Sequence, residues 1–198
     1  MNFEKYTDII LKLKEDDLIL RAQLLEKNEL NGGYNRIMEE MHNRNAGILN
    51  DIMDEIGYPT IDKVGTAASD AAWMIIQHAI GQPDFMKKSL VLLEEAVEKD
   101  EANPLNLAYL KDRIATFQGD FQLYGSAYDW DENGELSPKP YDDIDKVNQR
   151  RKALNLNTVE EQTQIMRDRL ESENQKAPAD MADRKKRYDE WRKKVGWI

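Results

Sequence analysis

The chain has no cysteine among its 198 residues, so disulfides, thiolate nucleophiles and cysteine-bound zinc are excluded. It has only two histidines, His42 and His78, which restricts imidazole chemistry to two positions. Ten glycines and six prolines are few, and they stand mainly at the boundaries between predicted elements.

Basic charge and long apolar runs are scarce as well. A net charge of -10 at pH 7 argues against a nucleic-acid-binding protein, which needs a basic face. No stretch approaches the ~20 apolar residues that span a bilayer, and the first residues lack the basic and apolar regions of a signal peptide. We therefore expect a cytoplasmic protein with no nucleic-acid or membrane partner. Its acidity would suit a basic protein partner.

The most apolar stretch, residues 66–80, organises the predicted fold. As a helix it is apolar around more than half of its circumference, which is typical of the centre of a bundle. Asp70 and Gln77 lie on one narrow strip of this helix, and His78 lies at the edge of the strip. Buried polar groups are costly unless they are paired, so the strip should have polar partners.

The predicted fold class is mainly α: a single helical bundle around the buried central helix 66–80, with one small β-hairpin near 121–137 and a C-terminal helical extension. Residues 1–157 should form the core domain with the hairpin, and residues 158–198 an extension packed on the same domain. Other helices are expected at 3–27, 34–56, 85–100, 104–118, 145–153, 158–174 and within 176–198.

The expected hairpin rests on alternating apolar and polar residues before Asn133-Gly134, a strong two-residue turn signal. Asp129, Asp131 and this pair also imitate four positions of a calcium-binding EF-hand loop. The last ligand position of such a loop should be a glutamate but is Pro140. We therefore expect a hairpin and not a calcium site.

Polar residues interrupt the apolar faces of other predicted helices. Asp17 lies on the apolar face of helix 3–27, with Arg21 one turn further on. Asn45 lies at the centre of the second apolar face, where a buried amide can simply fix the helix register. Glu39-x-x-His42 is half of a di-iron carboxylate motif, but no second half exists, so a di-iron site is not expected.

Short motifs in sequential order resemble a family of uncharacterised, mostly bacterial helical domains of unknown function. The family pattern is Asp-x-x-x-Arg, an Asn on the second helix, Gly-Trp-Pro-Thr, Ala-Ala-Trp ending in Gln-His, Leu-x-Asp-Arg and Gln-x-Tyr-Gly-Thr-Gln. The resemblance covers roughly residues 10–155 and implies no activity. Tyr58 replaces the family's Trp, and Ser126-Ala127 replace its Thr-Gln. The matching positions are Asp17, Arg21, Asn45, Gly57, Pro59, Thr60, Ala71, Ala72, Trp73, Gln77, His78, Asp112, Arg113, Gln122, Tyr124 and Gly125.

Polar residues on the apolar faces of separate helices would lose least free energy if they formed hydrogen bonds with one another in one shared cluster. These residues are Asp17, Asn45, Gln77, His78 and Asp112. The first functional hypothesis is a pocket in which His78 acts as general acid or base and Asp112 orients it. An anionic small molecule would bind there, and hydrolysis by activated water is a possible reaction because no nucleophile stands out. No cofactor and no metal are expected, although a metal held by His78, Asp17 and Asp112 is conceivable. The expected ligand-binding residues are Asp17, Arg21, Asn45, Gln77, Arg113, Gln122 and Tyr124.

The second hypothesis is a non-enzymatic acidic module that docks on a basic protein, as bacterial immunity proteins do. In that case the polar cluster is purely structural. The exposure of particular side chains separates the two hypotheses. A pocket requires His78 and Arg113 to face a cavity, whereas a docking module requires an acidic outer face that bears aromatic residues.

Overall fold

The computed structural model describes residues 3–30 and 34–198, and the chain divides into two compact units at Asn103 and Pro104. The described residues form nine helices and one two-stranded antiparallel hairpin, which confirms the predicted mainly α fold. None of these helices is long and apolar enough to cross a membrane. That residues 1–157 and 158–198 belong to one domain stays a prediction.

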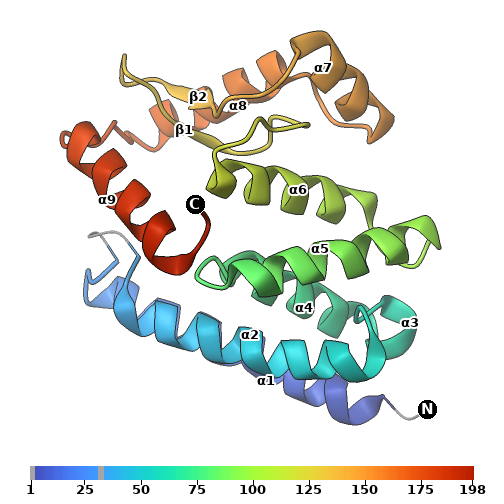
Figure 1. Cartoon of the computed structure of the whole chain (residues 1–198). Helices are drawn as coiled ribbons and strands as arrows, with labels where there is room; N and C mark the ends of the chain where they lie inside the picture. Colours follow the sequence, from blue (N-terminus) through green and yellow to red (C-terminus); the bar gives the residue numbers. More distant parts are fainter. Residues whose placement is uncertain (1–2, 31–33) are drawn as a thin grey trace. The chain divides into compact units, whose positions relative to one another are not determined.

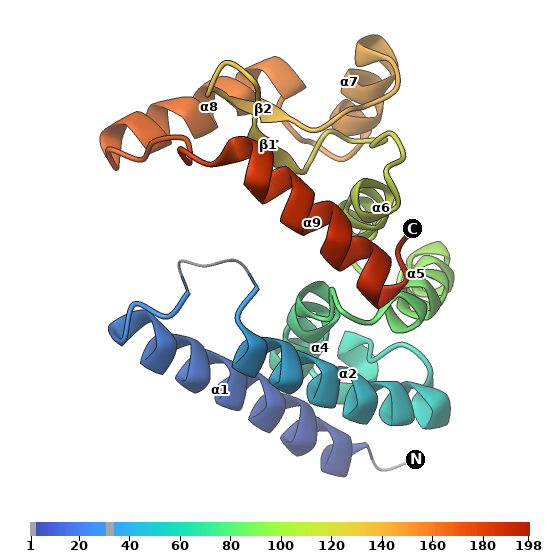
Figure 2. The ribbon, with the colours of Figure 1, turned by 60° about the vertical axis from the view of Figure 1, so that its left-hand side comes forward.

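The first unit is built around helix α4, which packs against α1, α2, α3 and α5 (Figures 1 and 2). Both of its isoleucines and its alanines other than Ala67 are buried, as expected for a central helix. Asp70, in contrast, is exposed, so the expectation that it needs a buried partner is wrong. Asp70 lies with Thr66 and Ala67 on the edge of the first turns of α4 that reaches solvent, while the opposite face stays covered. The elements are α1 (Glu4–Glu26), α2 (Arg36–Ile56), α3 (Ile61–Val64), α4 (Thr66–His78) and α5 (Pro83–Glu98).

Local signals fix the two ends of α2. The Asn35 side chain caps the start by accepting hydrogen bonds from the backbone amides of Ile37 and Met38 at 2.8 and 3.3 Å. Gly57 follows the last residue with φ 70°, a left-handed conformation that glycine adopts without strain.

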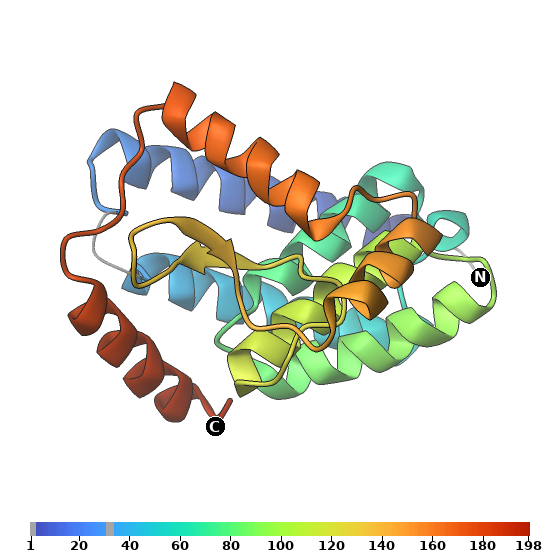
Figure 3. The same ribbon diagram turned by 90° about the horizontal axis from the view of Figure 1, so that it is seen from above.

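The second unit contains α6 (Pro104–Gln118) and three later helices around the hairpin (Figure 3). The predicted capping box is present, because the Thr158 hydroxyl accepts from the Glu161 amide and the Glu161 carboxylate accepts from the Thr158 amide. Strand β2 packs against α8. The remaining elements are β1 (Tyr128–Trp130), β2 (Leu136–Pro138), α7 (Ile144–Ala153), α8 (Val159–Ser172) and α9 (Met181–Val195).

The hairpin lies where it was predicted, but its turn differs. Five residues, 131–135, connect the strands, so the expected two-residue Asn-Gly turn is wrong. Asp131 closes the turn instead, because its Oδ1 accepts from the amides of Asn133 and Glu135 at 2.9 and 3.0 Å. The paired strands are also shorter than expected, since residues 123–127 lie in a loop.

Candidate functional site

The site in the first unit starts from Asp17, in the middle of the buried face of α1. Leu13 and Leu24 are buried on the same face, and only 1% of Asp17 is exposed. A carboxylate at such a position must be paired or hydrogen-bonded. The predicted partner, Arg21, is exposed and forms no ion pair with Asp17 in the described part of the chain. Two histidines take that place.

Asp17 Oδ2 lies 3.0 Å from Nδ1 of His78, the last residue of α4, and 3.0 Å from Nε2 of His42 in α2. The donor atoms of these three residues all lie within 4.8 Å of one another. The imidazole rings are 4.9 Å apart, centre to centre, and tilted by 41°. Nitrogen and oxygen ligands of one transition-metal ion, each about 2.0–2.1 Å from it, are separated by roughly 3 Å. The Asp17 contacts therefore have the spacing of a metal-binding set.

The electrostatics of the cluster keep Asp17 ionised. Burial alone would raise the pKa of this carboxyl, but the contacts with His42 and His78 outweigh burial and hold the pKa well below its ordinary value. Although His42 Nε2 is close to Asp17, neither this nitrogen nor Asp17 Oδ1 has a hydrogen-bond partner of acceptable geometry among the described residues. Both atoms are buried, and buried polar atoms in proteins are nearly always paired.

Tyr34 contacts the other ring nitrogen of His42. Tyr34 Oη lies 2.7 Å from His42 Nδ1 and donates a long hydrogen bond of 3.5 Å to the backbone carbonyl of His78. Burial raises the pKa of Tyr34, and nearby Glu39 and Asp17 raise it further, so the phenol stays protonated. In the tautomer in which His42 Nδ1–H donates to Tyr34, the lone pair of His42 Nε2 would face Asp17, and a cation between these two acceptors would satisfy both.

Asn45 and Gln77 are buried near the same helices but have different partners. Asn45 Nδ2 donates to the Leu13 carbonyl at 3.3 Å, which ties α2 to α1, and its Oδ1 accepts from Arg44 at 3.3 Å. Gln77 is 7% exposed, and its Nε2 has no hydrogen-bond partner in the described residues. The bond to Leu13 is consistent with the register-fixing interpretation of Asn45, and a ligand-binding role for Asn45 and Gln77 stays a prediction.

Asp112 belongs to the second unit and is fully buried in α6. Its Oδ1 accepts from the amides of Leu123 and Tyr124 at 2.8 and 3.0 Å. Its Oδ2 accepts from the amide and the hydroxyl of Ser126 at 2.9 and 2.8 Å. These donors satisfy both oxygens of Asp112 within the second unit. In the first unit Asp17 contacts His78, and an orienting role of Asp112 toward His78 stays a prediction.

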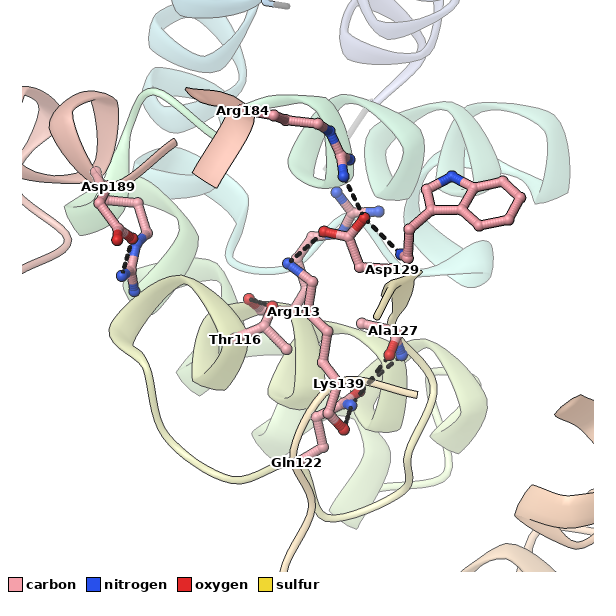
Figure 4. Close-up of polar contacts among 10 residues, drawn as sticks. Arg113, Thr116, Gln122, Ala127, Asp129, Lys139, Arg184 and Asp189 are labelled. Atoms are coloured by element: carbon pink, nitrogen blue, oxygen red, sulfur yellow. Dashed lines mark hydrogen bonds and ion pairs between the residues drawn. The ribbon is translucent and has the colours of Figure 1, made fainter. Parts of the chain in front are cut away.

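Gln122 and Tyr124 form part of the same loop architecture. Gln122 Nε2 donates to the carbonyls of Ala127 and Lys139 at 3.1 and 2.8 Å, and its Oε1 accepts from the Ala127 amide at 2.6 Å (Figure 4). The Tyr124 carbonyl accepts from Arg151 at 2.8 Å. The second unit thus uses Asp112 and Gln122 to fold the 122–127 loop, and a ligand-binding role for Gln122 and Tyr124 stays a prediction.

His42 is the residue that sequence reasoning missed, because it was weighed only as half of a di-iron motif. Its position on α2 carries a usable signal. Counting by helical turns, His42 shares one face with Met38, Asn45 and Leu49, all of which are buried. A histidine on that face, in a chain with only one other histidine, could have been paired with His78.

The comparisons with known proteins supply a family and no activity. Residues 5–173 match DUF6624, described as a family of unknown function. A search of the curated proteins and a search of the solved structures each found no significant match. The matched range contains Asp17, His42, His78 and Asp112, together with the motifs on which the sequence resemblance was based. Since the match spans most of the 198 residues, the chain belongs to the DUF6624 family.

Proposed function

We propose that Asp17, His42 and His78 bind one divalent first-row transition-metal ion, and that the bound ion supports hydrolysis of a small anionic substrate. The observation that carries this proposal is the position of Asp17 Oδ2, 3.0 Å from a nitrogen of each histidine. The buried, unpaired His42 Nε2 and Asp17 Oδ1 support it, because a metal ion would satisfy atoms that the described protein groups leave unsatisfied.

The donor set favours a transition metal over magnesium or calcium. Two imidazole nitrogens with one carboxylate suit zinc, iron or manganese, whereas magnesium and calcium prefer oxygen ligands throughout. Three protein ligands leave coordination positions open, as in catalytic zinc sites. His78 is the accessible member, with 33% of its side chain exposed, so its side of the cluster is where water and substrate would approach.

The chemistry follows from the charge of the centre. A divalent ion with one carboxylate and two neutral imidazoles has one net positive charge, which favours an anionic oxygen of a substrate. A metal ion held by Asp17, His42 and His78 would supply a bound water whose pKa is lowered to about 7, and hence a nucleophile at neutral pH. Hydrolysis by activated water requires no nucleophilic side chain, in accord with a chain that contains no cysteine.

A zinc titration of tag-free protein tests the proposal. Since the chain contains only two histidines, both of them in the site, imidazole nitrogen signals in an NMR spectrum report on this site without background. We expect one equivalent of zinc to shift both imidazoles. His42→Gln should weaken zinc binding more than about 100-fold. Loss of a residue that only hydrogen-bonds to a metal ligand already weakens binding by about 10–100-fold, and His42 is itself a proposed ligand.

Magnesium is the matched control for this titration, since the acidic surface would bind it without help from imidazoles. Zinc binding that leaves both histidine signals unshifted, or that is equally tight in His42→Gln, would contradict the proposed site. The hydrolytic part is tested separately with zinc-loaded protein on activated phosphate and carboxylate esters. His78→Gln is the negative control in that assay. If this variant hydrolysed the esters as fast as the wild-type chain, hydrolysis at the site would be excluded.

Tyr34 is predicted to act as a positioning residue for His42. Tyr34→Phe removes the hydroxyl that lies 2.7 Å from His42 Nδ1 and so frees the ring to change tautomer. We expect zinc affinity to fall about 10–100-fold, with a change in the tautomer of His42 seen in the imidazole nitrogen shifts.

Tyr6→Phe provides the matched control in the same unit, because the Tyr6 hydroxyl donates to Glu55 and to none of the three cluster residues. This variant should keep wild-type zinc affinity. An unchanged affinity in Tyr34→Phe would remove Tyr34 from the site.

A further inference from the structure

The second unit contains a cluster of cationic side chains in an otherwise acidic protein. Arg113 comes from α6, Lys139 directly follows β2, and Arg184 and Arg192 come from α9. Figure 4 shows Arg113, Lys139 and Arg184 gathered around Asp129. The cluster spans three elements that are well separated in the sequence, so the tertiary fold brings these charges together.

Two carboxylates neutralise part of this charge. Asp129 pairs with Arg184 at 2.5 Å and, more distantly, with Lys139 at 3.6 Å. Asp189 pairs with Arg192 at 2.6 Å. Four cations facing two carboxylates leave an excess of two positive charges. Burial lowers the pKa of Lys139, and the nearby charges of Arg184 and Arg192 lower it further. Asp129 acts in the opposite direction, but the net pKa is still below its ordinary value.

Arg113 is the member without a partner. Within residues 104–198, all of which the structure describes, its guanidinium has no hydrogen bond or ion pair, although it is only partly exposed. Burial lowers the pKa of this guanidinium, which reflects the cost of desolvating an unpaired cation. The buried Arg151 illustrates the usual case, since it donates to the carbonyls of Asn157 and Tyr124. The N–H donors of the Arg113 guanidinium are therefore available to an anionic ligand.

Tyr188 of α9 connects the cations. Lys139 Nζ lies 4.7 Å, and Arg192 Cζ 5.1 Å, from the centre of its ring. Arg113 is near enough to influence the pKa of Tyr188, which burial raises. The hydroxyl of Tyr188 and Nε of Arg192 are both buried and have no hydrogen-bond partner among the described residues. Arg192 also donates through its Nη1 to the Phe117 carbonyl at 2.9 Å, so the Tyr188 hydroxyl and Arg192 Nε are the donors here that remain without an acceptor.

We propose that Arg113, Lys139, Tyr188 and Arg192 form a binding site for the phosphate group of a ligand. A phosphate dianion matches the excess of two positive charges, and its oxygens accept from the planar fork of Arg113, which suits bidentate binding. The Tyr188 hydroxyl and Arg192 Nε supply further donors. This site is independent of the metal site, and its α9 residues lie beyond the range matched to the family.

Titration of the full chain with inorganic phosphate and with phenyl phosphate tests the site and separates the free ion from an organic phosphate. Trp191 stacks on Tyr188 with ring centres 6.0 Å apart, so the indole signal of Trp191 in an NMR spectrum is the local reporter. We expect saturable binding of at least one of the two compounds. Arg113→Gln should weaken that binding at least about tenfold, since a charge-assisted hydrogen-bonding partner is removed.

Arg169→Gln removes the same charge from an exposed position of the same unit and should leave the affinity unchanged, because Arg169 pairs only with Glu173 nearby. Lys139→Gln provides a second test if Arg113→Gln does not fold, and it should weaken binding as well. Absence of saturable binding of both compounds by the wild-type chain would overturn the proposal. Equal affinity in the folded variant and the wild type would overturn it too.

Discussion

Replacing Asp112 by alanine is expected to lower the free energy of unfolding by about 3–5 kcal/mol, because several buried donors lose the charged acceptor that they share. The carboxylate is fully buried and holds the amides of Leu123, Tyr124 and Ser126, together with the Ser126 hydroxyl. Alanine would leave these donors without an acceptor, and each buried unsatisfied donor costs about 1–3 kcal/mol.

Urea unfolding followed by circular dichroism measures this change. Hydrogen exchange adds a local readout, since the three amides should lose their protection in Asp112→Ala. Asp120→Ala, on the exposed start of the same loop, is the control and should stay within about 0.5 kcal/mol of the wild type. A loss below about 1 kcal/mol in Asp112→Ala would contradict the structural role assigned to this carboxylate.

Zinc is expected to raise the free energy of unfolding of the wild-type chain by about 2.7 kcal/mol at a free concentration of 100 times Kd, and Asp17→Asn should abolish this gain. The reason is that Asp17 Oδ2 is the atom that contacts both imidazoles, and an amide is a poor replacement for an anionic metal ligand. For a chain of this length the gain corresponds to roughly 5–10 °C in Tm.

Asp16→Asn is the control for this second experiment. Asp16 is the neighbouring residue on α1, but its side chain pairs with Lys12 and not with the histidines. This variant should keep the full stabilisation by zinc. If Asp17→Asn gained as much stability from zinc as the wild type, the ion would be bound elsewhere and the proposed centre would be wrong.

His78→Ala separates a functional cluster from a purely structural one. If the cluster exists to bind metal, this change should leave the metal-free fold near wild-type stability or above it, because sites kept for function often cost stability. If the cluster serves only the core, the same change should cost more than about 1 kcal/mol and affect no ligand. The partial exposure of His78 makes the first outcome the expected one.

The sequence by itself determined the helices and the location of the polar residues within them. The periodicity of apolar side chains predicts where α1, α2, α4 and α6 run, because this pattern depends only on 3.6 residues per turn. The same periodicity identified Asp17 and Asn45 as buried polar residues, since an interruption of an apolar face is visible in one helix alone. The capping box at Thr158 and Glu161 is equally local.

Only the tertiary structure decided which of these residues meet. Asp17 is 61 positions from His78 in the sequence, and no local pattern predicts that these two residues meet. The same holds for His42, which joins them in the cluster. Asp112 could not be assigned from side-chain patterns, because its partners are backbone amides, which every residue other than proline carries. Those same hydrogen bonds prevent residues 123–126 from joining the hairpin, although their alternation favours a strand. Side-chain periodicity fixes what a helix buries, whereas the partner of each buried polar group depends on how the helices and loops pack.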